Sequence, residues 1–236
     1  MASQLPDYAE LHALSNFSFQ RGASHAEELV ARAQALGYRA IAITDECSVA
    51  GVVRAHVAAR EHGIRLLPGA EFLLQAEWPI RLVVLPHDAA GWGNLCEFIT
   101  AARQLGDALE KGSYRVALGE TDFSLLAGCE ILLSPLQGAI NTEAMCTHAD
   151  WAGRLFGLKS WLAVELQQGL DDALRLQQLQ QVSSRTGLRL VAAGNVLMHV
   201  RSRKPLHDVM TAIGLGKTVH ECGFALQPNA EACLRP

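Results

Sequence analysis

The fold class is decided by one stretch of the sequence, Ser24-His-Ala-Glu27-Glu-Leu-Val-Ala-Arg-Ala-Gln-Ala-Leu-Gly37-Tyr-Arg-Ala40-Ile-Ala-Ile43-Thr44-Asp-Glu46. Ser24 and Glu27 have the spacing of a capping box, which predicts a helix start. The helix continues with apolar residues every three or four positions, and Gly37 follows it where glycine commonly ends helices. The short apolar run 40–43 then predicts a buried strand, and polar residues 44–46 end it.

The same alternation of helix and buried strand extends along the rest of the chain. Further strands are predicted at Arg65–Leu67, Leu82–Leu85, Ile131–Leu133, Leu162–Leu166 and Leu188–Ala192. Further helices are predicted at Val49–Glu61, Asn94–Leu105, Thr142–Phe156, Asp171–Arg185 and Lys204–Ile213, and residues 106–119 read as an exposed excursion. This order favours an α/β fold with parallel strands and outer helices. A (β/α) barrel of eight or slightly fewer units fits the length best, and an open doubly wound sheet is the alternative.

Composition excludes several classes of protein. The chain has 236 residues, a formal net charge of −4, 50% hydrophobic and 19% charged residues, which excludes a disordered chain. A mildly acidic balance also disfavours a dedicated nucleic-acid binder. The six cysteines form no CxxC pair, so a zinc knuckle has no support. No apolar run reaches the ~20 residues of a membrane span, and no secretory leader is visible, so we expect a cytoplasmic protein.

Four polar segments end or follow strand-like runs: Glu10–Ser15, Thr44–Glu46, Gly69–Glu71 and Gly194–Leu197. In a β/α barrel, catalytic groups lie at the carboxyl ends of the strands. These segments therefore form the candidate site.

Several of these residues also carry a resemblance to a known family. The segments Tyr8-Ala-Glu-Leu-His12-Ala-Leu14-Ser15-Asn-Phe-Ser18-Phe19 and Ala42-Ile-Thr44-Asp45 resemble the opening of the PHP (polymerase and histidinol phosphatase) domain. The segments 43–56 and 199–206 resemble the PHP domain of bacterial DnaE-type error-prone polymerases, the ImuC branch. The likeness runs over most of residues 8–226. It implies a distorted seven-stranded (β/α) barrel of PHP type.

The resemblance also implies a domain division. Residues 1–226 would be the PHP domain, and residues 227–236 would begin a linker or helix leading to polymerase domains that this sequence lacks. Asn229 could cap such a helix, because asparagine is a favoured N-cap residue.

An active PHP domain holds up to three metal ions with His, Asp and Glu ligands, and the resemblance allows each position to be checked. His12 matches the first His of the family's His-x-His, and Glu71 matches its bridging Glu. The second His falls on Leu14, a family Asp falls on Arg21, and the His of Thr-Asp-His falls on Glu46. Only part of the ligand set is therefore present.

The later ligand positions depart further. A family His falls on Arg81, a Cys or His falls near Pro135, and the final Asp-x-His falls on Asn195 and Leu197. Two or three weak ligands cannot hold a metal cluster against the cost of dehydrating the ions. We therefore expect no metal and no catalytic residue in this domain.

On this interpretation, His12, Glu46 and Glu71 are vestigial positions. Arg21 would be the cation that replaces the metals, by pairing with Glu71 or Glu46, because a guanidinium is effectively always charged and binds carboxylates in a bidentate fashion. Whether Glu46 permits one weak metal site is left open.

The resemblance implies that the parent chain is a DNA-directed DNA polymerase, a nucleotidyltransferase. It would act in translesion synthesis during DNA replication and repair after DNA damage, with Mg²⁺ in the absent polymerase domain. Partners of the parent would be its other domains, DNA, a Y-family-like accessory protein and the sliding clamp, and no membrane. Arg201, Arg203 and Lys204 could contact phosphate or another domain.

The domain itself is expected to be an inactive structural and interaction domain. The first alternative is an active metal-dependent PHP phosphoesterase or 3′–5′ exonuclease, which would need Zn²⁺, Mn²⁺ or Fe²⁺. The second alternative is a free-standing module that only binds a protein.

Overall fold

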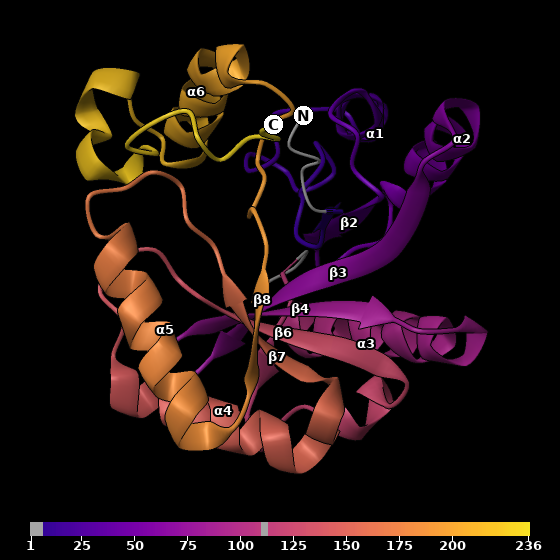
Figure 1. Ribbon diagram of the computed structural model, residues 1–236, viewed down its shortest axis with the longest axis vertical. Helices are drawn as coiled ribbons and strands as arrows, with labels where there is room; N and C mark the ends of the chain where they lie inside the picture. Colours follow the sequence, from indigo (N-terminus) through magenta and orange to yellow (C-terminus); the bar gives the residue numbers. More distant parts are fainter. Residues whose placement is uncertain (1–6, 110–112) are drawn as a thin grey trace, which may run out of the picture. The chain divides into compact units, whose positions relative to one another are not determined.

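The computed structural model describes residues 7–109 and 113–236, which fall into two compact units (Figure 1). Unit 1 is formed by the described parts of Met1–Ile43, Ala50–Leu67 and Gly194–Pro236. Unit 2 is formed by those of Thr44–Val49 and Pro68–Ala193. Each unit has its own hydrophobic core, and each is described by itself.

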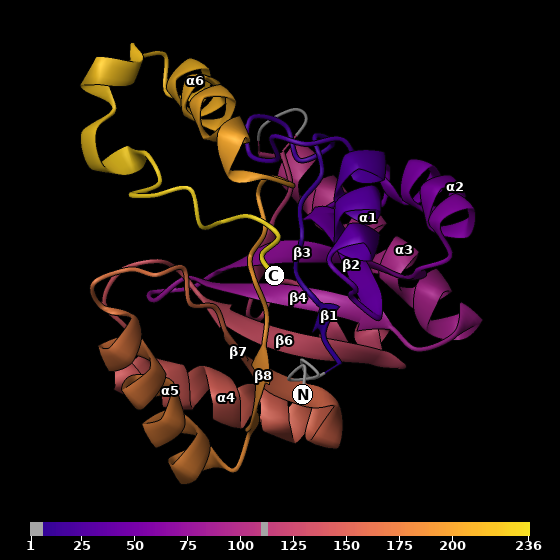
Figure 2. The ribbon, with the colours of Figure 1, turned by 45° about the horizontal axis from the view of Figure 1, so that its top comes forward.

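Unit 1 is built around two packed helices and a short parallel strand pair. Helices α1 (Ala26–Ala35) and α2 (Val52–His62) lie side by side, as Figure 2 shows. Strand β1 (Ala9–Glu10) pairs with the start of β2 (Ala40–Glu46), whose last three residues belong to unit 2. The core of unit 1 consists of the apolar faces of these elements, including Leu29, Val30, Ile41 and Ile43.

Helix α1 begins one residue later than the sequence predicted. Its N-cap is His25, whose backbone N–H donates to the side chain of Glu28 at 2.9 Å. Ser24, the expected cap, instead accepts a hydrogen bond from the backbone N–H of His199 at 2.9 Å. The tertiary partner of Ser24 therefore outweighs its local capping preference. Gly37 follows the helix with φ of 78°, as predicted.

Unit 2 is a sheet covered by helices. Its strands are most of β3 (Arg65–Gln75), then β4 (Ile80–Pro86), β6 (Cys129–Pro135), β7 (Ser160–Val164) and β8 (Arg189–Ala192). Helix α3 (Ala89–Asp107) packs on β4 and β6, α4 (Thr142–Phe156) on β6 and β7, and α5 (Asp172–Thr186) on β7 and β8 (Figure 1). The short 3₁₀ helices η1 (Phe123–Leu126) and η2 (Gly157–Lys159) connect these elements.

The expectation of parallel pairing is wrong for β4. Strands β6, β7 and β8 are parallel, but β4 runs antiparallel to both β3 and β6. Only residues 76–79 separate β3 from β4, whereas a parallel crossover needs a dozen or more residues. The connection is therefore a hairpin.

The predicted exposed excursion at residues 106–119 is also wrong in part. Helix α3 runs to Asp107, and β5 (Val116–Ala117) is a buried strand that pairs in parallel with the end of β3. Residues 110–112 of that stretch lie outside the described residues.

The last part of unit 1 contains helix α6 (Lys204–Gly214) and the short turns η3 (Arg201–Arg203), η4 (Val219–Glu221) and η5 (Gly223–Ala225). The helix predicted to start at Asn229 is wrong. Asn229 Oδ1 accepts from the Glu231 N–H at 2.9 Å, and Cys233 forms a parallel bridge with Met198. Burial of this segment outweighs the weak preference for a helix of two turns.

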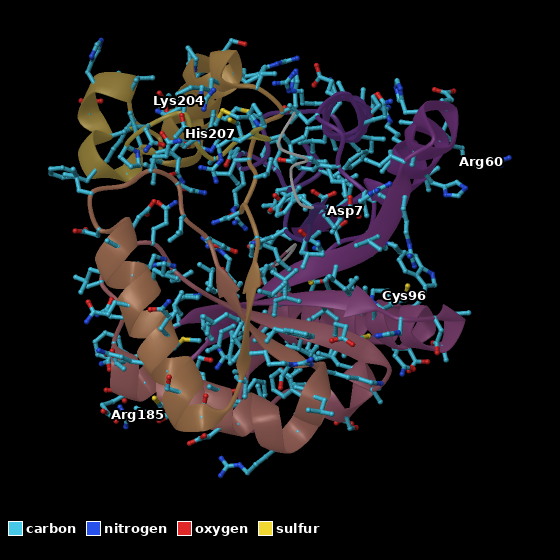
Figure 3. All side chains as sticks on the ribbon, in the orientation of Figure 1. Asp7, Arg60, Cys96, Arg185, Lys204 and His207 are labelled. Atoms are coloured by element: carbon cyan, nitrogen blue, oxygen red, sulfur yellow. The ribbon has the colours of Figure 1, made fainter. Side chains whose placement is uncertain are left out.

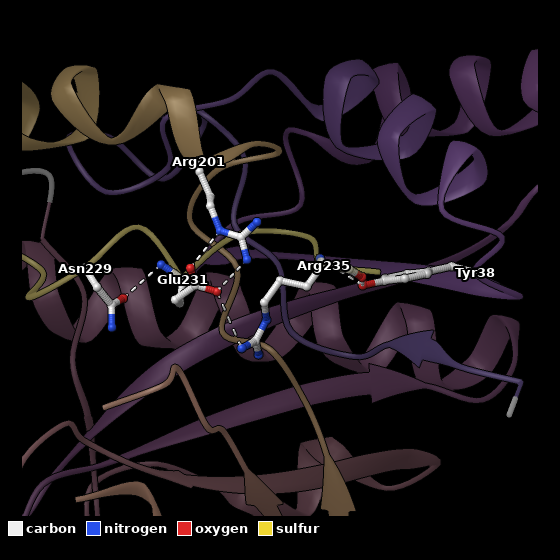
Figure 4. A network of polar contacts seen from close by, with 5 residues as sticks. All are labelled: Tyr38, Arg201, Asn229, Glu231 and Arg235. Atoms are coloured by element: carbon white, nitrogen blue, oxygen red, sulfur yellow. Dashed lines mark hydrogen bonds and ion pairs between the residues drawn. The ribbon is translucent and has the colours of Figure 1, made fainter. Parts of the chain in front are cut away.

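Side chains fix this segment to unit 1, as Figure 4 shows. Arg201 donates two hydrogen bonds to Glu231, at 2.7 and 2.9 Å. The Tyr38 hydroxyl donates to the backbone carbonyl of Arg235 at 2.6 Å. Residues 232–234 are buried among the apolar side chains of unit 1. The proposed domain boundary at residue 226 stays a prediction.

Candidate functional site

The three vestigial positions and the arginine expected to replace the metals are divided between the two units. His12 and Arg21 belong to unit 1, and Glu46 and Glu71 belong to unit 2. The predicted pairing of Arg21 with Glu71 or Glu46 therefore stays a prediction. Within each unit, the surroundings of these residues are well defined.

In unit 2, the cation beside Glu71 is Arg81. Glu71 lies on β3 and is almost fully buried, and Arg81 Nε on β4 is 4.0 Å from Glu71 Oε1. In the antiparallel register, Glu71 is opposite Val83 and Arg81 is opposite Leu73, so the two residues are diagonal neighbours on one face. The sequence comparison noted Arg81 as a departure from a family His but missed it as a partner. The two-residue alternation across a hairpin was the signal that could have found it.

Glu46 is engaged by a tyrosine. The Tyr114 hydroxyl donates to Glu46 Oε1 at 2.7 Å, and its oxygen accepts from the Leu73 backbone N–H at 3.2 Å. Burial, together with the negative charges of Glu46 and Glu71, raises the pKa of Tyr114 well above its usual value. The phenol is therefore a neutral donor to the Glu46 carboxylate. Sequence reasoning missed Tyr114, because it lies in the stretch expected to be exposed.

A second arginine of unit 2, which is buried, reaches the carboxyl end of β6. Arg175 on α5 donates to the backbone carbonyls of Pro135 at 2.6 Å, Leu136 at 3.0 Å and Gly138 at 3.3 Å. Burial is the main cause that lowers the pKa of Arg175, the charge of Arg81 adds to it, and Glu165 opposes it. A guanidinium thus reaches the end of β6, near Pro135, where the resemblance implies a Cys or His ligand.

These residues of unit 2 do not fit a metal cluster. Glu71 faces Arg81, and Glu46 accepts a hydrogen bond from Tyr114. Across residues 7–109 and 113–236, no three or more His, Cys, Asp or Glu side chains gather in a way that could hold an ion. The Glu71 carboxylate has a guanidinium 4.0 Å away, the Glu46 carboxylate accepts a hydrogen bond from a phenol, and the Arg175 guanidinium is held by backbone carbonyls.

In unit 1, the first and last polar segments lie side by side. The Leu14 N–H donates to the Val196 carbonyl, and the Val196 N–H donates to the His12 carbonyl, both at 2.9 Å. This parallel bridge brings the segment of His12 next to that of Asn195 and Leu197, as the common site predicted. His12 itself is fully buried.

Glu10 holds these two segments together. Its buried carboxylate accepts hydrogen bonds from the backbone N–H groups of His12 at 2.9 Å and Gly194 at 2.8 Å, and from the Tyr8 hydroxyl at 3.1 Å. Burial raises the pKa of Glu10 above its usual 4.5, and these hydrogen bonds offset only part of that effect. The role of Glu10 is structural, and sequence reasoning gave it none.

The remaining candidates of unit 1 have partners of their own. Arg201 binds Glu231, Arg203 binds Glu28, and Lys204 binds Asp208 at 2.6 and 2.7 Å. Contact of these three cations with phosphate or another domain stays a prediction. Burial is the main cause that lowers the pKa of His207, the charge of Asp208 opposes it, and the charges of Lys204 and Arg21 add to it.

A comparison with models of known protein families identifies the family of this chain. A model described as the PHP domain matches residues 10–169 of the chain. The chain belongs to the PHP domain family. None of the helices in the described part of this PHP domain combines the length and apolar character needed to cross a bilayer.

The curated relatives of this PHP domain are polymerases. It is 46% identical to the error-prone DNA polymerase of Ralstonia nicotianae, over 98% of this chain and 22% of the relative. It is 49% identical to the error-prone DNA polymerase of Methylococcus capsulatus, over 97% of this chain and 21% of the relative. The chain thus spans about a fifth of the length of the relatives it matches.

Two solved structures show the fold of this PHP domain. One is described as a candidate metal-dependent phosphoesterase from Bifidobacterium adolescentis, with a TM-score of 0.55, 16% identity, and coverage of 80% of this chain and 87% of that one. The other is an amidohydrolase from Chromobacterium violaceum, described with bound SO4 and no metal, with a TM-score of 0.59, 18% identity, and coverage of 81% and 88%. The predicted α/β fold of PHP type is confirmed.

Four non-glycine residues of the PHP domain have backbone in the left-handed region. Gln20, Cys47, Gln168 and Asn195 are the non-glycine residues with positive φ in the described ranges, at 61°, 43°, 54° and 47°. Gln20 precedes Arg21, Cys47 follows Glu46, and Asn195 occupies a family ligand position. Backbone of this kind is found preferentially at functional sites. Three of the four strained positions therefore lie beside or at residues that the sequence places in the candidate site.

Proposed function

We propose that this chain is the PHP domain of an error-prone, damage-inducible DNA polymerase, in which it binds no metal and serves as a structural and interaction domain. The observation that carries the proposal is the placement of Arg81 against Glu71. The bridging carboxylate of the family faces an organic cation built into the neighbouring strand. Arg175 adds a second guanidinium at the end of β6.

Electrostatics favours this interpretation over a metal site. A divalent ion about 5 Å from a guanidinium is repelled by roughly 7 kcal/mol at an effective dielectric constant of about 20. Two such groups in one unit would require more anionic ligands to compensate, and both Glu71 and Glu46 already have partners. Arg81 and Arg175 therefore supply the positive charge that metal ions supply in an active relative. That charge neutralises buried carboxylates.

The activity of the parent is proposed from its relatives. Proteins named error-prone DNA polymerase match nearly the whole of this chain, which supports a parent that adds nucleotides to DNA with Mg²⁺ held outside this domain. Translesion synthesis and repair, DNA, a Y-family-like accessory protein, the sliding clamp and a cytoplasmic location belong to the same proposal. The extent of the match weighs against a free-standing binding module.

An active phosphoesterase or 3′–5′ exonuclease remains the second candidate, because a structure of the same fold is described as a candidate metal-dependent phosphoesterase. The ligand positions of this chain disfavour it. Of the family's ligand set, only His12 and Glu71 keep the residue type, and Glu71 faces Arg81.

Metal analysis tests the proposal directly. The purified chain is incubated with Zn²⁺ or Mn²⁺, desalted and analysed for metal, and its hydrolysis of nitrophenyl phosphate and of single-stranded DNA ends is measured. We expect well under one ion per chain, no turnover, and no change of melting temperature with chelator, because no bound ligand is removed from the native state. Stoichiometric metal with turnover that His12→Ala abolishes would overturn the proposal.

A further inference from the structure

Helix α6 in unit 1 exposes apolar side chains of the kind that a surface helix usually buries. Leu206, Val209 and Ile213 are 42%, 45% and 63% exposed, whereas His207 and Ala212 are buried. The three apolar residues recur at intervals of three and four, so they form one stripe along the helix, which we call the α6 stripe. A surface helix ordinarily turns such a stripe toward its own core.

The charges of α6 do not cover this stripe. Lys204 and Asp208 are bound to each other at 2.6 Å, and both side chains are mostly buried. Figure 3 labels Lys204 and His207 on this helix. Figure 2 shows α6 with its connecting turns as the outer part of the segment that ends unit 1. Contiguous exposed apolar surface on a folded protein commonly marks an interaction site. The α6 stripe therefore has the features of an interface.

The curated relatives indicate what covers it. They match 97–98% of this chain, yet that match makes up only 21–22% of their length. About four-fifths of such a polymerase is polypeptide outside the matched region. We infer that an apolar surface of that polypeptide packs on the α6 stripe, and this inference rests on the proposed function of the chain as a polymerase domain.

The size of the stripe favours a tethered partner over a separate one. A stable complex of two separate proteins buries about 1,600 Å², far more than three aliphatic side chains provide. Contacts between domains of one chain are held at high effective concentration and can be as small as about 600 Å². A second copy of this chain or a separate accessory protein would need additional surface.

Matched substitutions on two helices of unit 1 test the inference. Val209→Glu places a charge in the α6 stripe, and Val53→Glu places the same charge on α2, where Val53 is 72% exposed. In this chain alone, both variants should melt within about two degrees of the wild type, because exposed substitutions have small effects. In the full-length polymerase polypeptide, Val209→Glu should increase the rate of limited proteolysis between domains by about tenfold, as expected for a charge placed in an interface. Val53→Glu should leave that rate unchanged.

Hydrogen exchange supplies the second measurement. Amides of residues 204–214 should exchange more slowly in the full-length polypeptide than in this chain alone. Equal exchange in the two, with Val209→Glu and Val53→Glu cleaved at the same rate, would overturn the inference. A dimer of this chain that Val209→Glu dissociates, or protection seen only when a separate protein is added, would overturn it too. Bound metal or phosphoesterase activity in this chain would contradict the proposed metal-free, inactive role. It would leave the slower hydrogen exchange of α6 in the full-length polypeptide unchanged, so the two proposals can fail separately.

Discussion

Glu10 and Gly194 are joined by a hydrogen bond of 2.8 Å from the Gly194 N–H to Glu10 Oε1, across 184 positions of the sequence. The bond ties the first polar segment of unit 1 to the last. It exists because residue 194 has no side chain: a Cβ there would lie 2.4 Å from Glu10 Oε2 and 2.9 Å from Val196 Cγ2.

The first prediction follows from that close approach. Gly194→Ala should lower the free energy of unfolding by about 2–4 kcal/mol, because it crowds a packed core and displaces a buried carboxylate from its donors. Urea unfolding measures the change. The control is Gly93→Ala on α3, where a Cβ would meet nothing within 4 Å. That exposed helical position should gain up to about 1 kcal/mol. Equal effects of the two substitutions would contradict the structural role of Gly194.

The second prediction concerns the pH dependence that Glu10 confers. Its pKa in the folded state is raised above 4.5, so the folded state binds more protons than the unfolded state between those two pKa values. Stability contributed by this group is therefore present below about pH 4.5 and is lost as pH rises through the folded pKa.

Glu10→Gln removes this titration while keeping an oxygen acceptor for the backbone donors. The stability of the wild type relative to Glu10→Gln should fall as the pH rises above 4.5. Urea unfolding of both proteins over this range gives the difference, in which all other titrating groups cancel. Parallel curves for the two proteins would show that Glu10 has an unperturbed pKa.

The third prediction addresses the pair that carries the proposed function. Arg81→Met should lower the free energy of unfolding by about 1–3 kcal/mol, because it leaves the buried Glu71 carboxylate without its neighbouring cation. Adding Glu71→Gln should recover much of that loss, since the neutral amide no longer needs a cation. A double-mutant cycle by urea unfolding measures the coupling. A coupling energy near zero would mean that Glu71 is neutralised by another group.

The sequence predicted an element correctly where residues within or beside that element determine its bounds. Helix α4 occupies the predicted residues Thr142–Phe156, because Asn141 accepts a cap bond from the Ala144 N–H at 3.1 Å and Gly157 ends the helix. Strand β3, by contrast, continues from Arg65 to Gln75 although Pro68 and Gly69 usually break strands. Pairing with β4 stabilises the part of the strand that follows them, at residues 70–74, and local propensity does not indicate this pairing.

In the candidate site, too, local features were predicted and distant partners were not. Three of its four polar segments end or follow strands, as predicted, whereas Gly69–Glu71 lies within β3. The bridge between Ala13 and Val196 confirms that two of the segments meet. The partners of the two carboxylates were not predicted. Arg81 reaches Glu71 through a hairpin register, which the expected parallel pairing concealed. Tyr114 reaches Glu46 from a segment 68 positions away that was expected to be exposed, and this pairing depends on tertiary packing.

The last prediction compares two arginine–glutamate pairs of similar geometry. Arg201 donates to Glu231 at 2.7 and 2.9 Å, and Arg185 donates to Glu143 at 2.7 and 3.0 Å. The pairs differ in the carboxylate, since the Glu231 side chain is 12% exposed and that of Glu143 is 78% exposed. Exposed pairs contribute little to stability, because water and salt screen them.

Arg201→Ala should therefore lower the urea midpoint of the chain and expose residues 232–236 to carboxypeptidase, whereas Arg185→Ala should change neither. The reason is that loss of Arg201 removes two hydrogen bonds from the largely buried Glu231 carboxylate. Glu231 adjoins the segment in which Cys233 forms a bridge with Met198. If the two variants unfold at the same urea concentration and resist the protease equally, the network of Figure 4 does not hold that segment in place. In that case the apolar contacts of residues 232–234 alone fix it to unit 1.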